Sequence, residues 1–201
     1  MMPTRPGQRG FLYLASQSPR RRDLLASLGL EVRILCADID EQRTAGEVAD
    51  AYARRLAIAK ARQADPPRSG PTAPILGADT VVVVGDRVMG KPANRDDAVD
   101  MLGALSGRSH WVHTGVAVVS AAAEAVTVSS TEVWFREISP AERHQYWATG
   151  EPADKAGGYA IQGFGALFVV EIRGSFTGVM GLPLFETARL LQEFGYKFLG
   201  T

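Results

Sequence analysis

The sequence predicts a mixed α/β fold, in which helices flank a twisted mixed sheet and two lobes surround a cleft. Apolar β-branched runs alternate with amphipathic runs that carry helix caps, and this alternation favours an α/β arrangement. The middle of the chain is rich in strand-type runs, which are expected to form a second lobe. The chain has 201 residues, 46% of them hydrophobic, enough for one substantial packed domain. We expect a flexible polar leader over residues 1–10 and a single two-lobed domain over 11–201.

The first part of the chain predicts two strand–helix units. Residues 11–15 (FLYLA) form a short apolar run typical of a buried strand. Ser18 suits an N-cap and Pro19 the first helical position, so a helix is expected to begin there. A second strand is expected over 31–39 and a longer helix over about 46–64. The apolar face of the first helix is expected to hold Leu24, Leu25 and Leu28, with Gly29 ending it. The stripe of the second helix is expected to hold Val48, Tyr52, Leu56 and Ala59.

The centre of the chain predicts a loop, a strand and a helix. Residues 65–74 (DPPRSGPTAP) read as a proline-rich loop, and 75–84 (ILGADTVVVV) as a strongly β-branched strand. Gly85-Asp86 then predicts a turn. Asn94 is expected to cap the N-terminus of a helix that follows this turn. Its apolar face is expected to hold Ala98, Leu102 and Leu105, and Gly107 is expected to end it.

The rest of the chain predicts a hairpin, two helices and a further strand. Residues 112–120 and 126–138 read as adjacent strands. Ser139-Pro140 with Glu142 forms a capping box for a short helix that ends at Gly150. The last elements expected are a strand over 165–174 and a closing amphipathic helix over 181–195.

The charge balance and the cysteine content exclude several classes of protein. Lys+Arg and Asp+Glu are equal at 22 each, so the chain has no net positive charge to attract nucleic acid or an anionic membrane. The single cysteine, Cys36, excludes an internal disulfide framework and a cysteine-rich zinc site. No apolar run suits a signal peptide or a membrane span. We expect a cytoplasmic protein with no membrane partner and no stable binding of nucleic acid.

Three arginines crowd the first turn of the helix in LASQSPRRRDLLASLG (14–29). The N-terminus of a helix carries partial positive charge, so Arg20, Arg21 and Arg22 are unfavourable there unless an anion offsets them. A strand–loop–helix unit also presents free backbone N–H groups to phosphates. The segment therefore predicts a phosphate site, with hydroxyl donors from Ser16 and Ser18. The alternative is a solvated surface group partly neutralised by Asp23.

Asp79 lies inside an otherwise apolar strand, where aspartate is disfavoured. A buried carboxylate needs a cation or several donors, which magnesium, Lys60 or Lys91 could supply. Placed near the end of a central strand, Asp79 would face the cleft of an open α/β sheet. The alternative is a structural aspartate that caps a loop.

Two weaker features lie between the arginine-rich segment 14–29 and the strand that carries Asp79. Asp38, Asp40 and Glu41 follow the second strand in ADIDEQR (37–43) and offer hard oxygen ligands to magnesium, although such loops are often simply solvated. Lys60 borders the apolar stripe of its helix. It either extends to water or neutralises phosphate in the cleft.

The stretch EPADKAGGYAIQG (151–163) reads as backbone that closes on a ligand, or as an ordinary turn. The amide of Gln162 could read a base edge, since it offers both a donor and an acceptor. His110 and His113 fall on opposite faces of a strand, which is wrong for a shared metal site.

Four ordered motifs resemble signatures of one family, the Maf nucleoside triphosphate pyrophosphatases. They are LASQSPRRRDLL, GADTVVVV with the following GKP, DKAGGYAIQG and GLPL, and the resemblance runs from about residue 12 to 195. It implies a two-lobed Maf/ITPase-like fold with the active site in the cleft, and often a homodimer. The implied activity is metal-dependent hydrolysis of a nucleoside triphosphate to the monophosphate and pyrophosphate.

The resemblance also implies roles for individual residues. Asp79 matches the catalytic proton acceptor, and Glu41 with Asp79 matches the ligands of a divalent cation, Mg²⁺ or Mn²⁺. The substrate-binding positions are Ser16, Arg20, Arg21, Lys60 and Lys91. The specificity positions are Arg20, Thr80 and Gln162.

Several of these motifs are similar to the branch of the family that acts on dTTP and UTP, and on modified pyrimidine nucleotides. They are the paired arginines of SPRR, Thr80 after Asp79, the DEQR segment and Gln162. One departure is Gly178-Val179-Met180 ahead of GLPL, where many members carry Asn-Val. Two other interpretations stay open: a 7-methyl-GTP pyrophosphatase of the same family, and a non-catalytic nucleotide sensor that regulates cell division.

Overall fold

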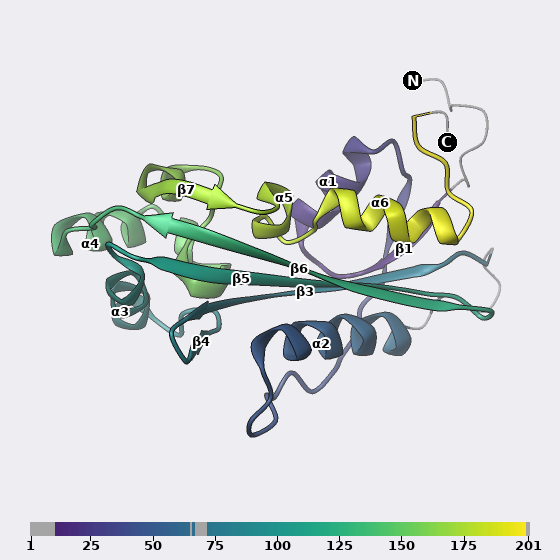
Figure 1. Ribbon diagram of the computed structural model, residues 1–201, viewed down its shortest axis with the longest axis horizontal. Helices are drawn as coiled ribbons and strands as arrows, with labels where there is room; N and C mark the ends of the chain where they lie inside the picture. The colour runs from purple at the N-terminus through teal and green to yellow at the C-terminus, as the bar shows by residue number, and fades with distance from the viewer. Residues whose placement is uncertain (1–10, 65, 67–71, 200–201) are drawn as a thin grey trace.

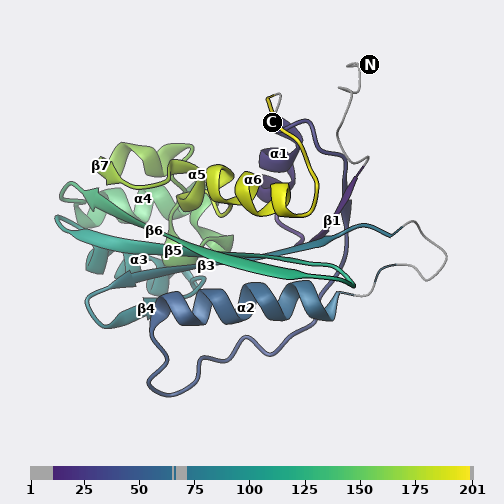
Figure 2. The same ribbon diagram turned by 45° about the vertical axis from the view of Figure 1, so that its right-hand side comes forward.

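The computed structural model describes residues 11–64, 66 and 72–199. At its centre is a seven-stranded mixed sheet with helices on both faces (Figures 1 and 2). The predicted α/β fold with a mixed sheet is confirmed. The predicted leader over 1–10 and most of the predicted loop over 65–74 lie outside the described residues. No helix among the described residues is long and apolar enough to cross a bilayer.

The strand order is β2-β1-β3-β5-β6-β7, and β4 pairs with β3 beside β1. Strand β1 pairs in parallel with β2 and with β3, whereas the pairs β3–β4, β3–β5, β5–β6 and β6–β7 are antiparallel. The bounds are β1 Leu12–Ala15, β2 Val32–Ile34, β3 Ile75–Val84, β4 Arg87–Met89, β5 Ser109–Val119, β6 Glu124–Phe135 and β7 Val169–Arg173.

Helix α2 covers one face of the sheet, and α1, α5 and α6 cover the other (Figures 1 and 2). The α-helices are α1 Pro19–Ser27, α2 Ala49–Gln63, α3 Arg95–Leu105, α4 Pro140–Ala148, α5 Phe176–Val179 and α6 Leu184–Glu193. Short 3₁₀ turns follow α4 at η1 Glu151–Asp154, η2 Ala156–Gly158 and η3 Phe164–Phe168. The capping box of Ser139 and Glu142 at α4 and the Asn94 cap of α3 are both present, as predicted.

Helix α2 lies unusually close to the sheet, because two glycines leave room for its backbone. A Cβ atom added at Gly77 would lie 2.3 Å from the carbonyl oxygen of Ala57, and one added at Gly115 would lie 2.4 Å from that of Ala53. At this separation only small side chains fit between helix and sheet. Of the predicted apolar stripe of α2, Leu56 is buried, whereas Tyr52 and Ala59 are only partly buried. The side chain of Val48 is exposed, and the buried positions are Ala53, Leu56, Ala57 and Ala61.

The sheet has a gap in one edge of β3. Strand β1 pairs with residues 75–77 of β3, and β4 pairs with residues 82–84 of the same edge. Among the described strands, none pairs with residues 78–81 on that side. Asp79 was predicted near the end of its strand, but β3 continues to Val84. The strand that ends beside Asp79 is β1, whose last residue, Ala15, lies opposite Gly77.

Other predicted boundaries also differ, because neighbouring segments limit each element. The strand expected over 31–39 is only the three residues of β2, since its partner β1 is itself four residues long. The strand expected over 165–174 begins only at Val169. The preceding residues form η3 because the carboxylate of Glu151 accepts hydrogen bonds from the N–H groups of Phe164 and Gly165.

The core consists of two main hydrophobic clusters that share strand β3. One contains Leu76 and Ala78 of β3 and packs them against β1, α1 and α6. The other contains Val82 and packs it against α3, α4, β5 and β6. Asp79 and Thr80 lie between these segments of β3 and are only partly buried. Strand β5 also contributes to both clusters, through Val116 and Val118 to the first and Val112 to the second, and the polar residues of β3 lie between the two.

His110 is buried within the second of these clusters. Its Nε2 atom lies 2.8 Å from the hydroxyl of Tyr159, and its ring makes an edge contact with Phe135. Burial lowers the pKa of His110 to about 4. His113 points to the opposite face, as predicted, and pairs with Ser130. His110 is therefore neutral in the folded protein at physiological pH.

This burial predicts that the protein loses stability in mild acid. An unfolded histidine has a pKa of about 6.5, so below that pH the unfolded chain binds a proton that the folded chain excludes until about pH 4. The free energy of unfolding should fall between these pH values by about 3 kcal/mol from this group. Urea denaturation of the wild type and of His110→Gln at pH 7 and pH 4.5 measures it. The variant should show a smaller loss, and parallel pH profiles would contradict the assignment.

Candidate active site

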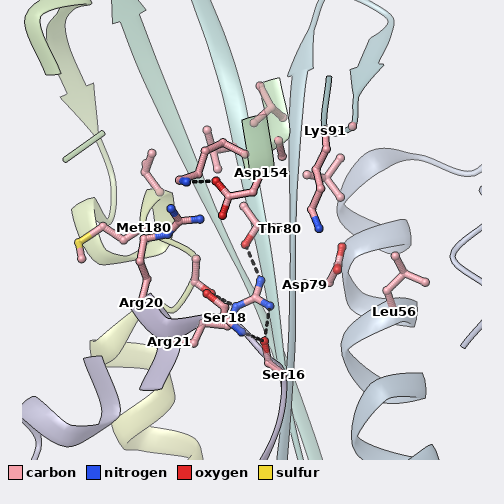
Figure 3. A pocket seen from close by; sticks show the side chains of 18 of the residues that line it. Ser16, Ser18, Arg20, Arg21, Leu56, Asp79, Thr80, Lys91, Asp154 and Met180 are labelled. Carbon is pink, nitrogen blue, oxygen red and sulfur yellow. Dashed lines mark hydrogen bonds and ion pairs between the residues drawn. The ribbon is translucent and has the colours of Figure 1, made fainter. Parts of the chain in front are cut away.

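A cavity of about 1010 Å³ opens at the gap in the edge of β3. Its walls come from the β1–α1 connection, the loop before α2, α2 itself, β3, the segment after β4, and residues 151–162 and 179–181 (Figure 3). The cavity is lined by every residue to which the family resemblance gave a role: Ser16, Arg20, Arg21, Glu41, Lys60, Asp79, Thr80, Lys91 and Gln162. Ser18 also lines it, whereas Arg22, Asp38 and Asp40 are not among the lining residues. The fold thus gathers residues that lie far apart in the sequence.

Lys60 joins two carboxylates at the floor of the cavity. Its Nζ atom lies 2.6 Å from Oδ1 of Asp79 and 2.7 Å from Oε1 of Glu41. The side chains of Lys60 and Asp79 are each only 14% exposed, so neither is a solvated surface charge. Lys91 is exposed, and Figure 3 shows its ammonium group extending toward Asp79. The site therefore holds both acids and cations before any ligand arrives.

The loop that carries Glu41 is fixed to α2 by residues that the sequence did not identify as functional. The hydroxyl of Tyr52 donates to the carbonyl oxygen of Glu41 at 2.6 Å. Arg55 binds both carboxylate oxygens of Glu47, at 2.7 and 2.8 Å, and also donates to the carbonyl oxygen of Gln42. Tyr52 was predicted as part of an apolar stripe, but its hydroxyl serves this loop. No local pattern indicated the pairing of Arg55 with Glu47.

Arg21 is the member of the arginine turn that is tethered within the fold, and its side chain is partly buried. Its Nε donates to the carbonyl oxygen of Gly181 at 2.8 Å, and its two terminal nitrogens donate to the hydroxyls of Ser16 and Thr80. Burial lowers the pKa of Arg21, and Asp79 is the largest opposing influence. Arg22 instead forms an exposed ion pair with Asp23. The alternative interpretation of the arginines as a solvated surface group therefore describes only Arg22. Arg20 lines the cavity on the side of Met180 (Figure 3).

The N-terminus of α1 suits an anion. Ser18 is at the N-cap, as predicted, but its side chain makes no capping hydrogen bond. The first turn contains no acidic residue. The backbone N–H groups of Arg20 and Arg21 have no intrahelical partner by the geometry of any α-helix, whereas that of Arg22 donates to the carbonyl oxygen of Ser18. Together with Arg20 and Arg21, this end of α1 can bind phosphate oxygens.

Glu151 shapes the wall that carries Gln162. Its carboxylate accepts hydrogen bonds from Tyr146 and from two backbone N–H groups in η3. A Cβ atom at Gly163 would lie 2.3 Å from Glu151, and the φ of Gly163 is +95°, so this position requires glycine. Gln162 itself is exposed on the cavity wall. The wall also contains Lys155, paired with Asp154.

The donor set fits a divalent cation held jointly with a substrate. Among the described residues, no group of three or more His, Cys, Asp and Glu side chains could hold a metal ion. Glu41 and Asp79, however, converge on one ammonium group. Magnesium in nucleotide enzymes commonly uses one or two carboxylates and completes its coordination with water and substrate phosphates. Two converging carboxylates beside the helix end that suits an anion fit that requirement.

Comparison with known proteins agrees with this architecture. The Maf family model, described as "Maf-like protein", matches residues 11–194. The chain belongs to the Maf family. Maf relatives at about half identity cover most of its length, and the family membership predicted from the sequence motifs is confirmed.

Three Maf relatives are each named "dTTP/UTP pyrophosphatase". The protein from Saccharophagus degradans is 55% identical over 188 residues, which are 91% of this chain and 88% of the relative. The protein from Alkalilimnicola ehrlichii is 49% identical over 195 residues, 94% and 95% of the two chains. The protein from Vibrio parahaemolyticus is 50% identical over 183 residues, 91% and 96% of the two chains.

The geometry of Arg21 predicts that Arg21→Lys destabilises this Maf protein. A lysine cannot reproduce the separate bonds to Gly181, Ser16 and Thr80, because it lacks the planar fork of guanidinium. Loss of two hydrogen bonds should lower the free energy of unfolding by about 2–3 kcal/mol, measured by urea denaturation. Arg22→Lys is the matched control on the exposed side of the same turn and should have little effect. Equal stability of the two variants would contradict a tethering role for Arg21.

Proposed function

We propose that this chain hydrolyses dTTP and UTP, and modified pyrimidine nucleotides, to the monophosphate and pyrophosphate. The observation that carries the proposal is the convergence of Asp79, Lys60 and Glu41 next to the arginine-rich end of α1 in one cavity. Such a site combines a base, two carboxylates for a cation and a binding place for phosphates. The names of the relatives support the choice of dTTP and UTP.

In this proposal the triphosphate binds along the cations of the cavity. Phosphate oxygens accept hydrogen bonds from the backbone N–H groups of α1, from Ser16, and from Arg20 and Arg21. Lys60 and Lys91 neutralise further negative charge. Positioned cations of this kind supply most of the catalysis in phosphoryl chemistry, because they meet the charge that develops on the leaving group.

Asp79 is the proposed proton acceptor. Its Oδ1 atom is fixed by Lys60, which orients the carboxylate in the cavity. Asp79 accepts the proton of a water molecule as the water oxygen attacks the α-phosphorus, and the bond to the bridging oxygen of pyrophosphate breaks. A bound Mg²⁺ or Mn²⁺ would be held by Glu41 and Asp79 and would supply Lewis-acid polarisation and charge neutralisation.

The same site raises two alternatives that the test below separates. A 7-methyl-GTP pyrophosphatase would release pyrophosphate from that nucleotide in preference to dTTP and UTP. A nucleotide sensor that regulates cell division would bind triphosphates without hydrolysing them. A cytoplasmic location, a homodimer and the absence of stable nucleic-acid binding remain predictions from the sequence.

The proposal predicts that the wild type releases pyrophosphate from dTTP and UTP when Mg²⁺ or Mn²⁺ is present. Asp79→Asn should lower kcat by about 10²–10⁴-fold, because an amide cannot accept the proton of water. Pyrophosphate and monophosphate are quantified for a panel that includes CTP, GTP and 7-methyl-GTP. The control is Asp86→Asn in the exposed turn after β3, which should keep wild-type turnover. Near-normal turnover of Asp79→Asn would reject Asp79 as the base.

A further inference from the structure

The hydroxyl of Thr80 belongs to a chain of hydrogen bonds that runs into the core. Its Oγ1 accepts a bond from Arg21 at 3.1 Å and lies 3.0 Å from Oγ1 of Thr114 on the neighbouring strand β5. Thr114 is fully buried, and its hydroxyl donates to the carbonyl oxygen of Gly178 at 2.8 Å. Elements α1 and β5 therefore meet at the side chain of Thr80, and Thr114 links it onward to α5.

The chain fixes the direction of each hydrogen bond. A carbonyl oxygen only accepts, so the single hydroxyl proton of Thr114 is committed to Gly178. In the hydrogen bond between the two threonines, Thr114 must then be the acceptor. The hydroxyl proton of Thr80 is therefore donated to Thr114. The reverse orientation would leave the contact of Thr114 with Gly178 unmade. Thr80 retains one lone pair, so its hydroxyl presents only an acceptor to the cavity.

This direction excludes some ligand atoms at Thr80. Phosphate and carbonyl oxygens cannot donate a hydrogen bond, so neither can pair with the remaining lone pair of Thr80. A ligand atom that contacts this hydroxyl must carry a hydrogen. At N3, uracil and thymine have such a donor, whereas cytosine has an acceptor there and carries its donor on the 4-amino group instead. The discrimination therefore applies to a base whose N3 faces Thr80.

The cavity on the side of Thr80 offers surfaces for a base next to the arginines that are proposed to bind phosphate. Adjacent residues of a strand point to opposite faces, and the side chains of Asp79 and Thr80 do so here (Figure 3). Lys60 and Glu41 contact the Asp79 side. On the Thr80 side lie Arg20 and Met180, as Figure 3 shows. Tyr159, Ile161 and Gln162 also line the cavity and offer flat, apolar and amide surfaces.

From this arrangement we propose that Thr114 is a specificity-determining positioning residue. Its buried hydroxyl holds Thr80 as an obligatory acceptor, so that the cavity takes a pyrimidine with N3–H and rejects one with a lone pair at N3. Thr114 touches no substrate and acts through Thr80. The inference rests on the proposed function, since it names how that site would separate UTP from CTP.

The test compares UTP with CTP, which differ only at the position 4 substituent and N3. In Thr114→Val the proton of Thr80 is released and can point into the cavity. The ratio of kcat/KM for UTP to that for CTP should fall by about tenfold or more, as expected when a mismatched buried hydrogen bond is relieved. Thr114→Ser keeps the hydroxyl and should restore the wild-type ratio.

Thr131→Val is the matched structural control. Thr131 lies on β6, is also buried, and donates to the carbonyl oxygen of Ser175 without touching Thr80. It should lose stability to a similar degree, measured by thermal unfolding, but keep the UTP-to-CTP ratio. If Thr114→Val lowers both activities equally, or if Thr131→Val changes the ratio as much, the inference is overturned.

Binding of the monophosphates separates this inference from the proposed function. Calorimetry gives the ratio of the dissociation constants of UMP and CMP for each variant without any turnover. A wild type that hydrolyses neither dTTP nor UTP, yet prefers UMP to CMP only when residue 114 carries a hydroxyl, overturns the function and supports the inference. A UMP-to-CMP ratio that is the same in the wild type and Thr114→Val overturns the inference, whatever the activity.

Discussion

The close approach of helix α2 to the sheet is the constraint on which the site depends. Gly77 and Gly115 leave no side chain between the helix backbone and the strands, and the alanines of α2 fill the contact. Lys60 precedes Ala61, whose backbone nitrogen would lie 2.6 Å from a Cβ at Gly77. This contact sets the ammonium group against Asp79, two residues further along β3. Larger side chains on this face of α2 would move Lys60 away from Glu41 and Asp79, the two carboxylates that it pairs with. Core packing and active-site geometry are therefore one property of this protein.

The gap in the edge of β3 explains why polar groups can gather between two apolar clusters. Strands β1 and β4 each occupy part of the same edge and leave residues 78–81 without a strand neighbour there. Side chains on both faces of β3 thereby reach one cavity, with Lys60 and two carboxylates on the side of Asp79 and two arginines on the side of Thr80. Two of these cations are already held by protein groups. Arg21 is held by three protein acceptors, and Lys60 by two. A preorganised site of this kind needs little rearrangement when a phosphate chain binds.

The sequence revealed those site residues that break a local rule. Asp79 stands out in an apolar strand, and the arginine turn stands out at a helix N-terminus, because each is unfavourable without a partner. The α/β class, the capping box and the hairpin of β5 and β6 also follow from local patterns. The ends of the strands could not be predicted from local patterns, because the length of β2, for example, depends on that of its partner β1. Tyr52 and Thr114 were missed for a different reason. A tyrosine in an amphipathic helix and a threonine in a strand are ordinary there, and only contacts with residues distant in sequence give them a role.

The bond from Arg21 to Gly181 joins residues 160 positions apart, and the hydroxyl of Tyr196 reaches the carbonyl of Phe11 across 185. Loop-closure entropy makes such contacts expensive until the intervening chain is ordered. During synthesis the arginine turn is made 160 residues before its acceptor Gly181. Until that acceptor is in place, the turn proposed to bind phosphate lacks one of the three bonds that hold Arg21. Ligand binding at this turn would then report completion of the fold, and a chain cut before residue 181 would lack the site although it contains every cation that lines it.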